Sequence, residues 1–152
     1  NPPAAVRHLA ACYCLADYRG AMRHLLHDIK YNGKQGKCRA CSVLLDRFPW
    51  PERFDRIDRV VPVPLAPEKL QRRGFNQAEA LFHDWASVRW DWCDALQRLR
   101  PTKVQWQLCR DERKENVHDA FAVKETVPVQ GKHILLVEQR CLGLIQYWER
   151  CA

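Results

Sequence analysis

The chain has no long hydrophobic run, no internal repeat and no low-complexity segment. A membrane-spanning helix needs about 18 or more consecutive apolar residues, and no run approaches that length. The sequence opens on Asn1-Pro2-Pro3, without the features of a secretory signal peptide. We therefore expect a cytoplasmic, reduced protein without a membrane partner.

Cysteine, in contrast, is abundant, with eight residues. A secreted disulfide scaffold is usually shorter and richer in loops. The pairs Cys12-x-Cys14 and Cys38-x-x-Cys41 could supply four thiolates to zinc. However, the first pair falls on a predicted strand and the second faces the core of a predicted helix, whereas zinc ligands normally lie in tight turns. We expect these thiols to be buried as small apolar groups and to bind no metal.

Length and charge indicate the general class of protein. At 152 residues, with 47% hydrophobic content, the chain is long enough for one globular domain. Lys and Arg number 25 against 18 Asp and Glu, which gives a net charge of +7. This balance favours acidic partners, namely phosphorylated metabolites, nucleic acid or anionic surfaces. The basic residues are dispersed rather than gathered in a tail.

The apolar pattern predicts alternating strands and helices. Residues 9–18, 57–63, 120–123 and 133–137 are expected as strands, and 133–137 (HILLV) has the continuous apolar character of a central parallel strand. Helical periodicity predicts helices over 18–31, 35–47 and 78–90. We expect an α/β fold with a parallel sheet, in which the strands near 58–63 and 133–137 are central.

Residues 60–80 combine a strand, a proline-stiffened loop and a helix start. The basic turn Gln71-Arg72-Arg73-Gly74 contains a glycine, which is free to adopt positive φ. Asn76 is a candidate N-cap for the helix that follows. Such a connection can bind an anion, but an ordinary strand–loop–helix with two solvated arginines explains it equally well.

Residues 99–121 form a second polar stretch. Together with Arg98 it carries six basic side chains, with Thr102, Gln105, Gln107 and Asn116 interleaved. These side chains could neutralise phosphate charges and donate hydrogen bonds to their oxygens. The alternative is a solvated amphipathic helix.

Taken together, these motifs resemble those of the ComF family (competence protein F-like). The sequence VVPVPLAPEKLQRRGFNQAEAL is similar to its IVPVPL…RxRGFNQ motif, and LQRLRPTKVQWQLCRDERKENVHDAFAV to its second, arginine-rich motif. Lys30-Tyr31-x-Gly33 resembles a third, shorter one. The resemblance implies a type I phosphoribosyltransferase domain, a glycosyltransferase of nucleotide metabolism or DNA uptake. It also implies phosphoribosyl diphosphate as ligand, Mg²⁺ as cofactor and single-stranded DNA or competence proteins as further partners.

The resemblance also implies roles for individual residues. Residues 62–76 would face pyrophosphate. Lys30 would be a cation that contacts either a phosphate or a residue that binds it. The segment 100–116 would be the mobile loop that closes over the ligand. The implied binding residues are Lys30, Arg72, Arg73, Gly74, Asn76, Arg100, Thr102, Gln105, Arg110, Arg113 and Asn116.

The chain departs from the family pattern after Val137. Where the family has two acids and a Thr/Gly phosphate loop, this sequence reads Glu138-Gln139-Arg140-Cys141. Glu138 could replace the first acid as the catalytic residue, but Gln139 cannot supply the second charge, and no Ser or Thr follows Thr126. We expect residues 1–16 to hold a linker end and first strand, 17–137 the domain, and 138–152 a divergent tail, with an apolar helix or packed segment near 142–148.

These departures from the family pattern bear on function. The sheet should be incomplete at its C-terminal part, the domain shortened at both ends, and the family's zinc ribbon absent. Activity as an enzyme is therefore uncertain. The alternatives are a non-catalytic nucleic-acid or partner-binding module and an inactive fragment.

Overall fold

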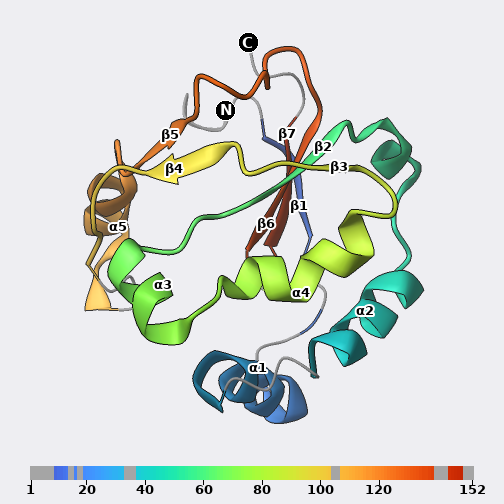
Figure 1. Cartoon of the computed structure of the whole chain (residues 1–152), viewed down its shortest axis with the longest axis horizontal. Helices are drawn as coiled ribbons and strands as arrows, with labels where there is room; N and C mark the ends of the chain where they lie inside the picture. Colours follow the sequence, from blue (N-terminus) through green and yellow to red (C-terminus); the bar gives the residue numbers. More distant parts are fainter. Residues whose placement is uncertain are drawn as a thin grey trace.

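The computed structural model describes residues 9–13, 16, 19–32, 37–103, 107–138 and 144–148. Its main sheet has five strands in the order β1-β7-β6-β2-β3 (Figure 1). These are β1 (Leu9–Tyr13), β2 (Arg59–Pro62), β3 (Asp91–Trp92), β6 (Ile134–Glu138) and β7 (Leu144–Trp148). β2 is parallel to both β3 and β6, whereas β7 is antiparallel to β6 and β1. The prediction of an α/β fold with parallel strands is confirmed.

The two strands predicted to be central lie inside the sheet. Val60 of β2 and Leu135 and Val137 of β6 are fully buried, because helices cover one face and loops the other. β7 differs from the predicted helix or packed tail near 142–148. Its β-branched and aromatic residues instead form a strand between β6 and β1, so the sheet is mixed rather than wholly parallel.

Helices α1 (Gly20–Asn32), α2 (Cys38–Arg47) and α4 (Gln77–Ala86) confirm the three predicted helices. α2 packs on α4, and α4 contacts β2, β3 and β6. Their apolar sides join the strands in one core that contains Leu26, Ile29, Leu45, Leu81, Phe82 and Trp85. Within the described part of the chain, none of the helices is long and apolar enough to cross a bilayer.

The cysteine predictions are confirmed in part. Cys38 and Cys41 are buried between helices, and burial raises the pKa of the Cys41 thiol to about 11. Cys12 is exposed on β1, contrary to the prediction that it is buried. The reason is that β1 is an edge strand, which leaves part of its surface open to solvent.

The basic stretch before Gly74 is a helix rather than the predicted turn. α3 (Pro67–Arg73) begins with proline at its first position, which suits an N-terminus, and ends at Gly74, which takes φ 80°. No residue of α3 is buried, so it lacks the apolar stripe from which sequence patterns identify a helix. Arg72 and Arg73 therefore lie in the last turn of a helix.

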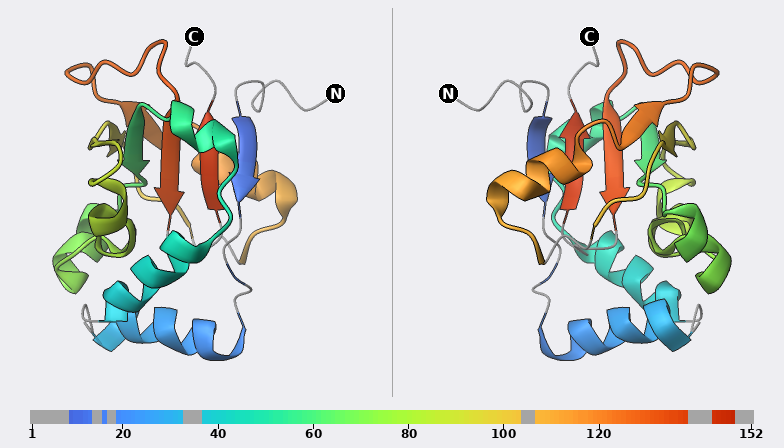
Figure 2. Two further views of the ribbon diagram at one scale, coloured as in Figure 1. Left: turned by 90° about the vertical axis from the view of Figure 1, so that its right-hand side faces the viewer. Right: turned by 90° about the vertical axis from the view of Figure 1, so that its left-hand side faces the viewer.

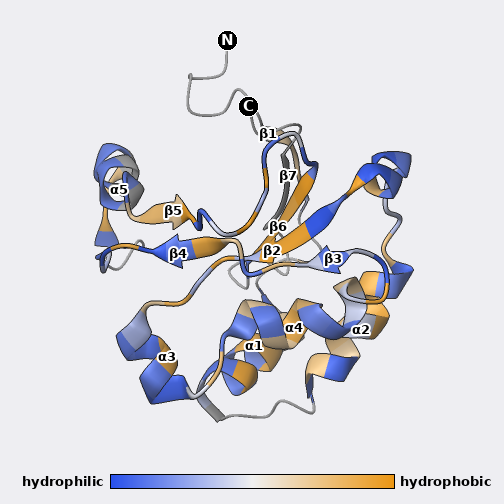
Figure 3. Ribbon diagram, turned by 45° about the horizontal axis from the view of Figure 1, so that its top comes forward, coloured by the Kyte–Doolittle hydropathy of each residue, from blue (hydrophilic) through white to orange (hydrophobic). Residues whose placement is uncertain are grey.

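A second, two-stranded sheet carries the arginine-rich stretch. β4 (Leu96–Arg98) pairs antiparallel with β5 (Phe121–Val123), and α5 (Arg110–Val117) lies between them in sequence. Next to β4, Ala95 packs with Val61 and Ile134 on the face of the main sheet opposite α2 and α4. Figure 3 shows the hydrophobic colour concentrated in the main strands and the inner sides of the helices, while α3 and α5 are largely hydrophilic.

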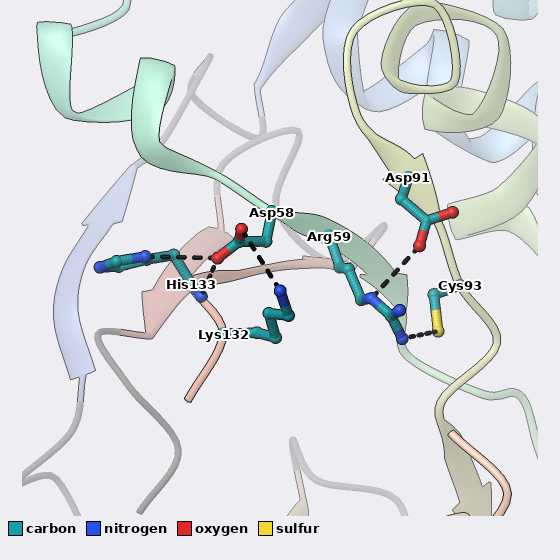
Figure 4. Close-up of polar contacts among 6 residues, drawn as sticks. All are labelled: Asp58, Arg59, Asp91, Cys93, Lys132 and His133. Atoms are coloured by element: carbon teal, nitrogen blue, oxygen red, sulfur yellow. Dashed lines mark hydrogen bonds and ion pairs between the residues drawn. The ribbon is translucent and has the colours of Figure 1, made fainter. Parts of the chain in front are cut away.

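Charged residues fix the amino ends of the parallel strands (Figure 4). Asp58 accepts a hydrogen bond from the His133 backbone N–H at 2.8 Å and lies 3.9 Å from Lys132 Nζ. Arg59 lies 3.2 Å from Asp91 and donates to Cys93 Sγ at 3.8 Å. The hydrogen bond from His133 N–H lowers the pKa of Asp58. These contacts explain the two charges at the start of an otherwise apolar strand.

Candidate functional site

An exposed aromatic ring lies among basic side chains where α1 and α3 end. The Tyr31 side chain is 58% exposed. Lys30 Nζ lies 4.9 Å from the centre of its ring and Arg73 Cζ lies 5.9 Å away. The His27 ring lies one helical turn earlier, 4.6 Å from the Tyr31 ring. We call Lys30, Tyr31, Arg72, Arg73 and the neighbouring His27 the Tyr31 site.

The electrostatics of the Tyr31 site follow from these contacts. A hydrogen bond with Lys30 lowers the pKa of the Tyr31 phenol against a smaller opposing effect of burial, and the charges of Lys30, Arg73 and Arg72 lower it further. Partial burial lowers the pKa of Arg73, although a guanidinium stays charged at neutral pH. The ring is therefore held in a positive local field.

Arg73 is oriented by the first turn of the next helix. Its Nη1 donates to Gln77 Oε1 at 2.8 Å. Gln77 is only 2% exposed and is the one buried polar residue in the described part of the chain. The contact joins the end of α3 to the start of α4 and fixes the guanidinium near the Tyr31 ring.

Gly74 and Asn76 shape the connection between α3 and α4. The Gly74 N–H closes α3 by donating to Leu70 O at 2.7 Å. The Asn76 side chain accepts from Ala78 N–H at 3.0 Å, which confirms the predicted N-cap, and donates to Val63 O at 3.1 Å. Both residues thus set the position of Arg73, and Asn76 ties the junction to the carboxyl end of β2.

This arrangement lies on the side of the sheet where an α/β protein usually binds ligands. In Figure 2 the arrowheads of β2 and β6 point toward the end of the molecule occupied by α1. Ligands of α/β sheets bind beyond the carboxyl ends of parallel strands, where loops and helix ends converge. The Tyr31 site belongs to this end.

The arginine-rich stretch uses its predicted ligand residues for internal contacts. Arg100 Nη2 donates to Glu115 O at 3.1 Å and His118 O at 2.5 Å, at the end of α5. The Asn116 side chain accepts from Lys103 N–H at 2.8 Å and donates to Lys103 O at 3.0 Å. These bonds hold α5 against the segment that follows β4.

The remaining residues of that stretch are placed as follows. The Thr102 hydroxyl accepts a hydrogen bond from Arg98. Arg110 begins α5, and Arg113 lies one turn further along it. Gln105 lies outside the described residues. Although Figure 1 shows α3 and α5 on the same side, Figure 2 shows them toward opposite edges of the sheet. The fold therefore does not bring Arg72 and Arg73 beside α5.

Glu138, the predicted catalytic acid, is the last residue of β6 and pairs in register with Leu144 of β7. Its side chain is half-buried. In the parts of the chain that the structure describes, no group of three or more His, Cys, Asp or Glu side chains could hold a metal ion. The Mg²⁺ expectation stays a prediction.

Sequence reasoning did not identify Tyr31 or His27 as members of the Tyr31 site, nor Gln77 as the residue that orients Arg73. The approach of Tyr31 to Arg73 depends on how α1 lies beside α3. Gln77 carries no distinctive signal beyond its place directly after the N-cap Asn76.

Comparison with known proteins gives one group of relatives. The chain is 32% identical to the DNA utilization protein YhgH of Escherichia coli strain K12 over 155 aligned residues, covering 90% of the chain and 67% of that protein. The protein of the same name from E. coli O6:H1 gives the same values. The one from Salmonella typhi is 31% identical over 131 residues, covering 82% of the chain and 56% of that protein. No protein-family model and no solved structure matches the chain.

These findings correct the ComF assignment. The relatives carry the name DNA utilization protein YhgH, and no family model supports a ComF phosphoribosyltransferase. The structure gives a physical reason why the motifs can mislead. Gly74 and Asn76 serve as helix caps, and Arg100 and Asn116 bond to backbone groups. Residue types that suit a diphosphate site therefore also meet local structural needs.

Proposed function

The chain belongs to the family of the DNA utilization protein YhgH, and from this premise we propose that it binds single-stranded DNA at the Tyr31 site. The relatives' name concerns the use of DNA. The single observation that carries the proposal is the exposed Tyr31 ring with Lys30 and Arg73 within 6 Å of its centre.

The chemistry of the site suits a single strand. An unpaired base can stack on an exposed aromatic face, and basic side chains beside that face can contact the phosphates. Tyr31 supplies the ring, and His27 supplies a second ring on the same side of α1. Lys30, Arg72 and Arg73 supply the charge. Duplex DNA offers no free base face for such stacking, so it should bind more weakly.

The helix ends explain why cations gather here, and they leave charge for a ligand. Lys30 and both arginines lie in the last turns of α1 and α3, where they offset the partial negative charge of the helix dipole. That charge is about half a unit for each helix, so the three cations exceed it. The net charge of +7 adds a long-range attraction for a polyanion.

The proposal is tested by titrating a fluorescent oligothymidine and recording its anisotropy between about 50 and 200 mM salt. Each phosphate contact contributes about 0.7 to the slope of log K against log salt for single strands. The double variant Lys30→Ala/Arg72→Ala should therefore lower the slope by about 1.4. Replacing Mg²⁺ by EDTA in a parallel series tests whether binding depends on the metal.

A matched control is available in the short helix η3 (Glu52–Arg56), where Arg53 and Arg56 are exposed. Arg53→Ala/Arg56→Ala removes the same charge from another part of the surface and should leave the slope nearly unchanged. No binding by the unaltered chain, or an equal loss in both double variants, would refute a defined site.

A further inference from the structure

Two hydrogen-bond donors at the junction of α3 and α4 are buried without a partner among the described residues. They are Arg73 Nε and Gln77 Nε2. These two atoms lie close together, because the same two side chains are joined by the hydrogen bond from Arg73 Nη1 to Gln77 Oε1. A buried donor without an acceptor is costly, and native proteins rarely keep two side by side without a functional or solvent partner.

The missing partner must be an acceptor, and the charge of Arg73 favours an anionic one. A guanidinium and an adjacent amide offer several N–H groups in a planar array, which matches the oxygens of a phosphate. Gly74, the residue after Arg73, borders open space, since a Cβ built there would meet nothing within 4 Å. A phosphate bound to Arg73 and Gln77 would lie near Tyr31, because the centre of the Tyr31 ring is 5.9 Å from Arg73 Cζ.

We infer that Arg73 and Gln77 form a pocket for the terminal phosphate of a DNA strand whose end base stacks on Tyr31. This rests on the proposed function and adds a preference for strand ends. Both donor atoms are buried, so a phosphate can reach them only where the surrounding groups make way for it. An internal phosphodiester continues into the strand on both sides and cannot enter as deeply, whereas a terminal phosphomonoester can. A terminal group also carries more negative charge.

The test uses one oligonucleotide sequence in three forms, with a 5′-phosphate, with a 3′-phosphate, and with hydroxyl groups at both ends. One phosphorylated form should bind the unaltered chain about tenfold more tightly than the hydroxyl form, the gain expected for a charge-assisted hydrogen bond. Inorganic phosphate should compete with that gain and leave the binding of the hydroxyl form unchanged.

Two variants locate the effect. Gln77→Glu keeps the size of the side chain and its contact with Arg73 but presents a negative charge to the phosphate. It should abolish the preference, which is measured as the ratio of the affinities of the phosphorylated and hydroxyl forms for the same variant. Arg73→Lys keeps the charge but loses Nε and should reduce the preference as well. Thermal unfolding checks that each variant is folded. If Gln77→Glu does not fold, the Arg73→Lys variant carries the test, because Arg73 is partly exposed.

Equal affinity of the three oligonucleotides for the unaltered chain would overturn the inference and leave the proposed function intact. A preference that survives in both folded variants would also overturn it. If none of the three binds, the proposed function fails and the inference fails with it.

Discussion

Tyr31→Ala is the most informative single change, because it removes the ring and leaves the cations. Stacking of a base on an aromatic side chain contributes about 1–3 kcal/mol, so affinity for single-stranded DNA should fall by about 5- to 150-fold. The Tyr31 side chain is 58% exposed. The free energy of unfolding should therefore change by no more than about 0.5 kcal/mol, as is usual for exposed positions. Tyr31→Phe keeps the ring and should bind almost as well as the original chain.

The pH dependence of binding gives a second view of the same residue. Lys30 and both arginines of the site hold the pKa of the Tyr31 phenol below its ordinary value near 10. Raising the pH through this lowered pKa creates a phenolate that repels the phosphates. DNA affinity should therefore fall at a pH below 10, while the Tyr31→Phe variant keeps its affinity over that interval.

The same shift has a defined effect on folding. Because the pKa is lower in the folded state, the phenolate's contacts stabilise the fold above the unfolded pKa near 10, and this contribution is lost as the pH falls through the folded pKa. It is absent at neutral pH. Unfolding curves at pH 7 should therefore coincide for the Tyr31→Phe variant and the original chain.

Anisotropy titration at constant ionic strength measures both effects, and circular dichroism confirms that the variants are folded. If Tyr31→Ala binds as tightly as Tyr31→Phe, base stacking on this ring is excluded. If the alkaline loss of affinity is the same in Tyr31→Phe, the phenol is not its source.

Other changes test the structure outside the Tyr31 site. Asn116→Ala removes both bonds to Lys103 and should cost about 1 kcal/mol locally; hydrogen exchange in α5 should quicken while DNA affinity stays constant, and unchanged exchange would contradict the contact. The lowered pKa of Asp58 stabilises the fold above the unfolded pKa near 4 and is lost as the pH falls through the folded pKa. Asp58→Asn should therefore flatten the fall of the melting temperature below about pH 4, and equal slopes would be evidence against it. Phe82→Ala should destabilise the chain by about 3–5 kcal/mol in urea unfolding, since its ring is fully buried, whereas a loss below about 1 kcal/mol would place it outside the core. The Cys41 thiol, with its pKa raised to about 11, should resist alkylation until the chain unfolds, and rapid native labelling, detected by peptide mass spectrometry, would oppose this.

The sequence predicts those elements that bury a regular apolar pattern. β2 and β6 are continuous apolar runs because both of their faces are covered, and α1, α2 and α4 show the helical period because one side packs on the core. α3 was not predicted because it has no buried side.

β7 was not predicted as a strand, since its place depends on pairing with both β6 and β1, and β1 lies at the other end of the chain.

The site is predictable only as far as its residue types. Arg72 and Arg73 stand out in sequence because they precede Gly74 and the N-cap Asn76. Lys30 stands out as a cation near the end of a predicted helix. Their approach to Tyr31 depends on how α1 and α3 pack, which no local pattern specifies. Arg100 and Asn116 look equally suited to bind phosphate, but their side chains bond to backbone groups around α5. Sequence alone cannot tell whether the acceptor of such a side chain belongs to a ligand or to the protein.

Photo-crosslinking tests the location of the DNA site most directly. An oligonucleotide carrying 5-iododeoxyuridine is irradiated with the unaltered chain, and the adducts are mapped by peptide mass spectrometry. The proposed site predicts that the adducts concentrate on Tyr31 and disappear in Tyr31→Ala. Adducts that map instead to α5, or that persist at full yield in Tyr31→Ala, would contradict the account.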